Sequence, residues 1–306
     1  MRNPLFNKIC IVGVGLIGGS LGMAIKKRKL AKMVMGVVRR RQTIAKAFHK
    51  RALHGATMNL KEGVRDADLV ILCAPVSTIL QQLKVLRPML APKARVIDVA
   101  SSKLLVDHAA KKYLKGIHFV GCHPMAGAAK SGLELANADM FDGAGCFMTH
   151  ADKVVDKFWR SLGAHTHILT PQSHDEWVAH VSHLPHILAF ALFQSGGAKR
   201  LARLGIEACN PSIQDLARLS KSDPKLWADI LLSNKKEIMH ALHEHERSIR
   251  HLKKALASKN ANEIERFIGR ANTSSMRLAP DSKAGNKLSR QVAHGGYVYV
   301  RRRGAR

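Results

Sequence analysis

A glycine-rich segment near the N-terminus constrains the fold of this chain more than any other part of its sequence. The segment KICIVGVGLIGGSLG places Gly13, Gly15 and Gly18 in G-x-G-x-x-G spacing directly after an apolar run. This spacing predicts a strand, a tight turn and a helix whose N-terminus carries a pyrophosphate. Gly13 permits the turn, Gly15 lets the backbone approach the phosphates, and Gly18 allows close packing of helix and strand. Leu16 and Ile17, at the start of the helix, complete the expected cofactor-binding set.

The first half of the chain alternates β-rich runs with amphipathic helical stretches. Further strands are expected in MVMGVV, ADLVILCAP, ARVIDVA, HFVGCHP, CFMTH and THILT. Alternation of this kind is typical of a mostly parallel sheet covered by helices. We therefore predict an α/β fold, with a Rossmann-type NAD(P)-binding domain over residues 1–170.

Two long helical segments dominate the second half. Residues 175–193 are expected to form one helix, which Pro185 should kink because proline removes a backbone hydrogen bond. A second helix should begin at Pro224, with Asp223 as its cap, and continue to about residue 256.

Helices this long and apolar on one side need a partner surface. We therefore predict an all-helical dimerisation and substrate domain over residues 171–278, through which the chain forms a homodimer. Residues 279–306 are rich in Gly, Ser, Lys and Arg and show no helical period, so a flexible basic tail is expected there.

The chain is strongly basic, with 50 Lys and Arg against 22 Asp and Glu and a net charge of +28. Such a charge attracts anions, which include nucleic acids, anionic membranes and small phosphorylated or carboxylated molecules. Aromatic residues make up only 5% and no zinc-knuckle or RNP-like motif occurs, which disfavours nucleic acid. A generally basic surface without a specific polyanion partner is the simpler interpretation.

Two features bear on the compartment. The apolar run over residues 9–25 contains five glycines at fingerprint positions, so we interpret it as strand, turn and helix rather than as a signal peptide or membrane span. The five cysteines are odd in number and include no C-x-x-C pair, which is typical of reduced packing residues. A cytoplasmic protein without membrane contact is expected.

The stretch GVVRRRQ, residues 36–42, bears on the choice of cofactor. In NAD-binding units an acidic residue near this position holds the ribose hydroxyl groups, but here the second strand ends near Val38 and three arginines follow. Arg39 and Arg40 offer permanently charged donors suited to a 2′-phosphate, so NADP is the expected cofactor and NAD the alternative. The competing interpretation assigns these arginines to the general basic surface.

Two polar segments follow strands of the cofactor half. DVASSK contains Ser101 and GCHPMAG contains His123, so both residues should lie at the carboxyl edge of the sheet, where such folds bind ligands. Histidine exchanges a proton near neutral pH, which makes His123 a candidate base, although a lone histidine can also be structural.

The motifs GVGLIGGS, DVASSK, HPMAG, SHLPH, and SIQDLAR followed by KSDPKLW come in the order and spacing of the prephenate/arogenate dehydrogenase family of tyrosine biosynthesis. The chain resembles this family over roughly residues 8–270. The resemblance implies a Rossmann-type domain, a helical dimerisation domain, and NAD(P)-dependent oxidative decarboxylation of prephenate or arogenate.

The resemblance also implies roles for individual residues. His123 matches the catalytic histidine that accepts the hydrogen bond of the substrate ring hydroxyl, and Ser101 matches the serine that orients it. Arg218 matches the arginine that binds a substrate carboxylate. His183 and His186 match residues of the helical domain that face the site, with His186 near the substrate side chain. Packing histidines on an apolar helix are the alternative for the last two.

The expected reaction converts prephenate to 4-hydroxyphenylpyruvate, with hydride transfer to the nicotinamide and His123 as the proton acceptor. No metal is expected. Arogenate, or both substrates, is the alternative. A more distant alternative is a basic, non-catalytic binding protein on the same fold, which would bind DNA weakly and with a steep dependence on salt.

Overall fold

The computed structural model describes residues 3–127, 132–197, 200, 203 and 211–278. The expected basic tail, residues 279–306, lies outside the described residues, as does Cys209. The chain divides into two compact units, Met1–Lys235 and Lys236–Arg306. Among the residues that the structure describes, no helix combines the length and apolar character needed to cross a bilayer.

The first unit is built on a sheet of eight strands in the order β3-β2-β1-β4-β5-β6-β7-β8. All neighbouring strands are parallel except β6 and β7, which pair antiparallel. The strands are β1 (Phe6–Val12), β2 (Ala31–Val37), β3 (Gly55–Thr57), β4 (Leu69–Leu72), β5 (Arg95–Asp98), β6 (His118–Pro124), β7 (Gly145–Met148) and β8 (His165–Ile168).

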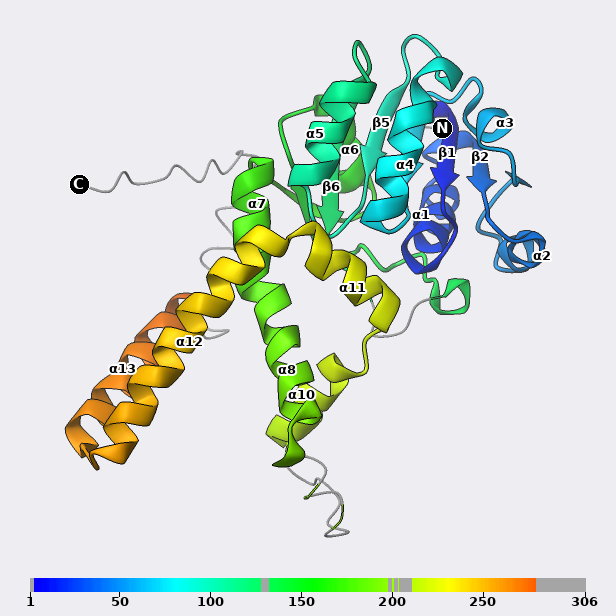
Figure 1. The fold of residues 1–306 in the computed structure, drawn as a ribbon. Helices are drawn as coiled ribbons and strands as arrows, with labels where there is room; N and C mark the ends of the chain where they lie inside the picture. Colours follow the sequence, from blue (N-terminus) through cyan, green and yellow to red (C-terminus); the bar gives the residue numbers. More distant parts are fainter. Residues whose placement is uncertain (1–2, 128–131, 198–199, 201–202, 204–210, 279–306) are drawn as a thin grey trace. The chain divides into compact units, whose positions relative to one another are not determined.

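Helices cover both faces of this sheet, as Figure 1 shows. Alternate residues of β1 supply the two cores: Ile9 and Ile11 pack with one cluster, and Cys10 and Val12 with the other. The first cluster includes residues of α1 (Leu16–Lys27), α2 (Arg41–His49) and α6 (Lys153–Ser161). The second includes residues of α3 (Leu60–Val64), α4 (Val76–Leu86) and α5 (Leu104–Tyr113). The predicted Rossmann-type sheet is thus confirmed.

The remaining elements of the first unit are helical. They comprise the short 3₁₀ turns η1 (Arg87–Met89) and η2 (Leu133–Leu135), then α7 (Pro171–Val178), the π-helical turn η3 (Ala179–His183), α8 (Leu184–Gln194), α10 (Pro211–Ser220) and α11 (Pro224–Ser233). The helix expected over residues 175–193 is present as α7, η3 and α8. Pro185 is the second residue of α8 and follows the π turn η3 without a break, so the irregularity expected from its missing N–H lies in the π turn just before it.

The prediction of a single helix from Pro224 to about residue 256 is wrong in one respect. It begins as predicted, because the Asp223 carboxylate accepts hydrogen bonds from the backbone N–H groups of Lys225 and Leu226. It ends at Ser233, however, and α12 (Lys235–Ala257) starts anew. The break is at Asn234, whose buried side chain donates to the backbone carbonyl of Asp175 instead of facing solvent.

The second unit contains α12 and α13 (Ala261–Leu278), which Figure 1 shows side by side. His251 of α12 joins them, because its Nε2 lies 2.8 Å from Oε1 of Glu263 and its ring stacks on Phe267. The pair forms a helical hairpin.

Candidate active site

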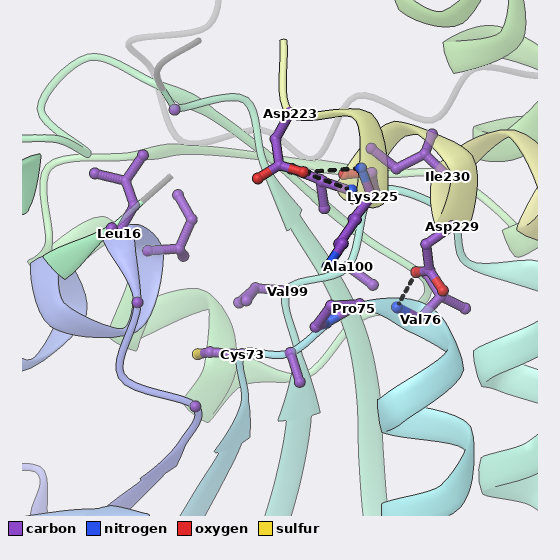
Figure 2. A pocket seen from close by; sticks show the side chains of 18 of the residues that line it. Leu16, Cys73, Pro75, Val76, Val99, Ala100, Asp223, Lys225, Asp229 and Ile230 are labelled. Atoms are coloured by element: carbon purple, nitrogen blue, oxygen red, sulfur yellow. Dashed lines mark hydrogen bonds between the residues drawn. The ribbon is translucent and has the colours of Figure 1, made fainter. Parts of the chain in front are cut away.

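A large cavity opens at the carboxyl edge of the sheet within the Met1–Lys235 unit. Its volume is about 1300 Å³, and its lining includes the loop from Gly13 to Ile17, the segments after β2, β4, β5 and β6, and parts of α10 and α11. Figure 2 shows Leu16 of α1 across this space from Ile230 of α11. Pockets for one small ligand measure roughly 300–1000 Å³, so this cavity has room for a dinucleotide together with a second molecule.

The three fingerprint glycines have different structural roles, two in packing and one in leaving room for a dinucleotide. Gly13 has φ +101°, and a Cβ there would lie 2.4 Å from the carbonyl oxygen of Cys73. A Cβ on Gly18 would lie 2.0 Å from the carbonyl oxygen of Gly13. Both glycines are therefore required by the chain's own packing. A Cβ on Gly15 would meet nothing within 4 Å, so this glycine keeps open a space in the cavity that a pyrophosphate can fill.

The segment after β2 brings Arg39 and Arg40 into the cavity lining, and both side chains are exposed. Arg41 begins α2 and is not among the lining residues. Sequence reasoning found no acidic residue near this position, but the fold brings one: Glu134 of η2 lies in the lining and pairs with Lys46 of α2. Lys46 holds the pKa of the Glu134 carboxyl below its usual range.

His123 lies at the end of β6 and is partly exposed to the cavity, opposite Phe147 of β7 in the antiparallel pair. Burial lowers the pKa of His123 well below its usual range, and the proximity of three other basic groups, His174, Lys103 and His183, adds to this shift. The ring is therefore neutral at neutral pH, which is the form that can accept a proton.

His174 contacts His123 from the side away from the cavity. The cap of α7 places it: Thr170 Oγ1 accepts the N–H of Ser173 and Pro171 takes the first helical position, so His174 lies in the first turns. His174 Nε2 lies 2.9 Å from His123 Nδ1, and the two rings meet edge to face. His174 Nδ1 lies 2.8 Å from Oδ1 of Asp175.

Asp175 is held by backbone groups. Its two carboxylate oxygens accept hydrogen bonds from the N–H groups of Lys103, at 2.7 Å, and Leu104, at 2.9 Å. These groups begin α5, so Asp175 serves as a cap supplied from a distant part of the chain. His174 and Asp175 are both 1% exposed.

The DVASSK segment is anchored by a buried ion pair. Lys103 Nζ pairs with Asp98 Oδ2 and donates to the carbonyl oxygen of Cys122, the residue before His123, at 2.8 Å. Asp98 Oδ2 also accepts the N–H of Ala100 at 2.9 Å. Asp98 is 0% and Lys103 1% exposed. The pair joins the ends of β5 and β6 directly beneath the candidate base.

Ser101 lies in the cavity lining with His123, as the sequence predicts. Its neighbour Ser102 is buried and donates to Ser233 Oγ of α11 at 2.8 Å. The segment after β5 is thereby tied to the helical part of the same unit.

The helical wall of the cavity includes His183, His186 and Arg218, three of the residues expected there. The ring of His186 stacks on Trp227 with centroids 4.0 Å apart, and its Nδ1 lies 2.8 Å from the carbonyl oxygen of Ser182. His183 is 1% exposed, and its Nδ1 lies 3.3 Å from Asn234 Nδ2. The Arg218 guanidinium group lies near enough to His186 to lower the pKa of that histidine, although burial is the larger cause.

Asp229 of α11 closes the far edge of the cavity. Figure 2 shows its carboxylate at the N-terminus of α4, where Oδ2 accepts the N–H of Val76 at 2.6 Å and Oδ1 the N–H of Ser77 at 3.1 Å. The start of α4 is thus occupied by a carboxylate of the chain itself, which links α11 to the sheet part.

Comparison with known proteins identifies the family. Residues 21–166 match the model for the prephenate dehydrogenase nucleotide-binding domain, and residues 170–270 match that for the prephenate dehydrogenase dimerization domain. The chain belongs to the prephenate dehydrogenase family. This family is one of oxidoreductases, so the resemblance and fold class expected from the sequence are both confirmed.

Individual family members are similar over most of the chain. The prephenate dehydrogenase of Lactococcus lactis subsp. cremoris is 29% identical over 265 residues, which cover 85% of this chain and 74% of that protein. The prephenate dehydrogenase of Aquifex aeolicus, solved in complex with hydroxyphenyl propionate and NAD+, is 28% identical with a TM-score of 0.79, over 89% of this chain and 98% of that one. Synechocystis arogenate dehydrogenase is 27% identical with a TM-score of 0.73, over 89% and 99%.

Sequence reasoning missed the buried residues that hydrogen-bond to the elements carrying the site of this family member. These are Asp98, Lys103, His174, Asp175 and Asn234, all buried and none of them singled out as a site residue. His174 and Asp175 come three and four residues after Pro171, but the capping pattern Thr170-Pro171 predicts only the start of the helix and not their burial. Polar residues in the first turns of a helix are mostly exposed in proteins, whereas the fold buries these two.

Acidification should destabilise this family member through its buried histidines. Burial lowers the pKa of His183 from 6.5 to about 4. Between these values the unfolded chain binds a proton that the folded chain does not, so stability is complete above pH 6.5 and declines as the pH falls toward 4. The loss from His183 alone should reach about 3 kcal/mol. Urea unfolding at several pH values between 7 and 4 measures this loss.

The matched variant for this measurement is His183→Gln, which removes the titrating ring and keeps a polar side chain. Its unfolding free energy should depend less steeply on pH than that of the wild type between pH 6.5 and 4. His123, His174 and His186 also have lowered pKa values, so part of the slope should remain. An unchanged slope in the variant would contradict the assignment to His183.

Proposed function

We propose that this chain catalyses the NAD(P)-dependent oxidative decarboxylation of prephenate to 4-hydroxyphenylpyruvate. One observation carries the proposal: His123, the glycine-rich loop and Arg218 line the same cavity. A base, a dinucleotide cradle and an anion-binding guanidinium group are the three parts that this reaction needs.

Each residue type suits a step of the reaction. A neutral His123 takes the proton of the ring hydroxyl as that carbon loses hydride, which stabilises the positive charge developing there. A nicotinamide bound at the glycine-rich loop would supply the hydride acceptor. Arg218 binds a substrate carboxylate and orients the ring, and Ser101 orients the hydroxyl. Loss of CO₂ restores aromaticity and drives the reaction forward.

His183 and His186 contribute from the helical wall. His183 is buried and bonded to Asn234, which suits a role in shaping the cavity. His186 is only partly buried, and its Nδ1 is bonded to the Ser182 carbonyl, so in this proposal Nε2 is the ring nitrogen that contacts the substrate side chain.

The tautomer and charge of the His186 ring favour arogenate as a second candidate substrate. The Ser182 carbonyl only accepts hydrogen bonds, so Nδ1 of His186 carries the hydrogen, and the lowered pKa keeps the ring neutral. Nε2 is then an acceptor. The amino group of arogenate can donate to it, whereas the keto oxygen of prephenate cannot.

Absorbance of the reduced nicotinamide tests the proposal. Purified protein is mixed with prephenate or arogenate and with NADP or NAD, at one ionic strength. Turnover of prephenate above arogenate is expected. Turnover of arogenate alone would identify arogenate, not prephenate, as the substrate. No turnover in any of the four mixtures would refute the proposed activity and favour a non-catalytic basic binding protein.

The cofactor choice should depend on Arg39. We expect Arg39→Ala to reduce the preference for NADP over NAD, taken as the ratio of the two kcat/KM values, by about 10- to 100-fold, because one charge-assisted hydrogen bond contributes roughly 1.5–3 kcal/mol. Initial rates with each cofactor at saturating substrate measure this ratio.

Arg41→Ala is the matched control, since Arg41 is the adjacent arginine and does not line the cavity. It should leave the ratio unchanged. An equal change in both variants would assign the effect to the general positive charge rather than to a 2′-phosphate contact.

We further propose that the helical part beginning near residue 171 pairs two copies of the chain. The description of the matching family model as a dimerization domain supports this proposal. Exposed apolar side chains on α12 and α13, including Ile249, Leu256 and Ile268, support it as well.

A further inference from the structure

The candidate base is the first member of a buried chain of three side chains. His123 Nδ1 lies 2.9 Å from His174 Nε2, and His174 Nδ1 lies 2.8 Å from Asp175 Oδ1. His174 and Asp175 are not among the residues that line the cavity, and both are 1% exposed. They therefore do not touch a molecule in the cavity, and the contact that joins His174 to the cavity lining is the one to His123.

The chain of contacts determines where the protons are. A carboxylate only accepts, so His174 Nδ1 carries a hydrogen and donates it to Asp175. In a neutral His174 ring, Nε2 is then an acceptor, and the hydrogen shared with His123 must belong to His123 Nδ1. His123 Nε2 is left with a free lone pair, which is the form of the ring that can take a proton.

This arrangement requires a neutral His174. Burial lowers the pKa of His174 and so does the charge of Lys103, while Asp175 and Asp98 raise it in part. Around the ring are also His123, Phe147 and His183. If His174 were protonated, it would donate to His123 Nδ1, and His123 would carry its own hydrogen on Nε2, where it could accept nothing.

Asp175 is held in a fixed position, so its carboxylate can fix the positions of the hydrogens on His174 and His123. Backbone N–H groups of Lys103 and Leu104 hold both of its oxygens, and Asn234 Nδ2 donates to its backbone carbonyl at 2.8 Å. Asp175 also lies at the N-terminus of α5, where the helix dipole attracts a negative charge.

We propose that Asp175 and His174 are positioning residues that fix the tautomer of His123 and share the positive charge when His123 accepts the substrate proton. This proposal rests on the proposed function for its kinetic consequences only. In the step itself the substrate O–H bond breaks, the proton forms a bond to His123 Nε2, and His123 Nδ1 keeps its hydrogen in the bond to His174.

Nitrogen NMR of the histidine rings tests the tautomer without substrate or turnover. The chain has 17 histidines, so the His123 signals are identified by their loss in His123→Gln. At pH 7.5 the wild-type enzyme should show Nδ1 protonated and Nε2 unprotonated in His123. The reverse pattern would overturn the proposal, whether or not the enzyme turns over prephenate.

Two substitutions at His174 separate positioning from simple packing. His174→Gln places an amide oxygen near the site of Nε2, so it can still accept from His123. His174→Asn places its amide near the site of Nδ1, so it keeps the contact to Asp175 and removes the acceptor. We expect kcat to fall about 100- to 1000-fold in the Asn variant and within about 10-fold in the Gln variant.

KM for the substrate should change little in either variant, because His174 does not line the cavity. The Asn variant should also lose the single His123 tautomer in the NMR spectrum, and the Gln variant should keep it. Equal losses of kcat in both variants that follow their melting temperatures would mean that His174 only packs, and would overturn the proposal. A wild-type kcat in the Asn variant would overturn it as well.

Discussion

Replacing His123 by asparagine is expected to lower kcat by about 10²- to 10⁴-fold and to leave KM within about threefold, because general acid–base catalysis contributes a factor of that size. The side chain of asparagine can still donate to His174 Nε2 from near the position of Nδ1. It has no counterpart of Nε2, so nothing accepts the substrate proton. Steady-state kinetics with prephenate and NADP measure both constants.

The matched control for this prediction is His118→Asn. His118 lies at the opposite end of the same strand, is exposed and does not line the cavity, so kcat and KM should both remain at wild-type values. The assignment of His123 as the base would be refuted by unchanged turnover in His123→Asn. A rise in KM that accounts for the whole loss would instead assign His123 to substrate binding.

Replacing Lys103 by methionine should lower the free energy of unfolding by about 3–5 kcal/mol, since it leaves a buried carboxylate without its partner. Lys103 pairs with Asp98, which is fully buried. Within the described part of the chain, Asp98 Oδ1 has no hydrogen-bond partner, so Lys103 is the main compensation for this charge. Urea unfolding at pH 7 followed by circular dichroism measures the loss.

A double variant tests the cause. Adding Asp98→Asn to Lys103→Met removes the unpaired charge and should restore a large part of the lost stability, because the two residues are coupled. Lys27→Met, which breaks an exposed pair with Asp139, should change stability little. If the double variant were less stable than Lys103→Met, packing of the lysine stem rather than the buried charge would explain the loss.

Local sequence patterns were sufficient to predict features whose interacting residues are close together in the chain. The fingerprint could be predicted because Gly13, Gly15 and Gly18 act on one turn, and the start of α11 because Asp223 caps its own helix. The positions of His123 and Ser101 followed from a general property of parallel sheets, whose strand ends meet at one edge. The motifs further along the chain, together with those at the fingerprint, also indicated the family.

Contacts between distant segments escaped prediction. Glu134 reaches the cofactor cavity through Lys46, which is 88 residues away in sequence, and Asp229 caps α4 from a distance of 153 residues. The prediction of one long helix after Pro224 was wrong for the same reason. Asn234 interrupts the helix because its side chain donates to a backbone carbonyl group of α7. Helical periodicity contains no information about such a partner.

The sequence by itself determined the fold class, the family and some of the residues on both walls of the cavity, because these follow from periodic burial and from short motifs in order. Only the tertiary structure decided how the candidate base is held. His174 and Asp175 become its support through burial against β6 and α5, where water is excluded and each polar atom must find a partner within the chain. Burial of a polar residue depends on the packing of whole elements, so no local pattern at residues 174 and 175 reveals it.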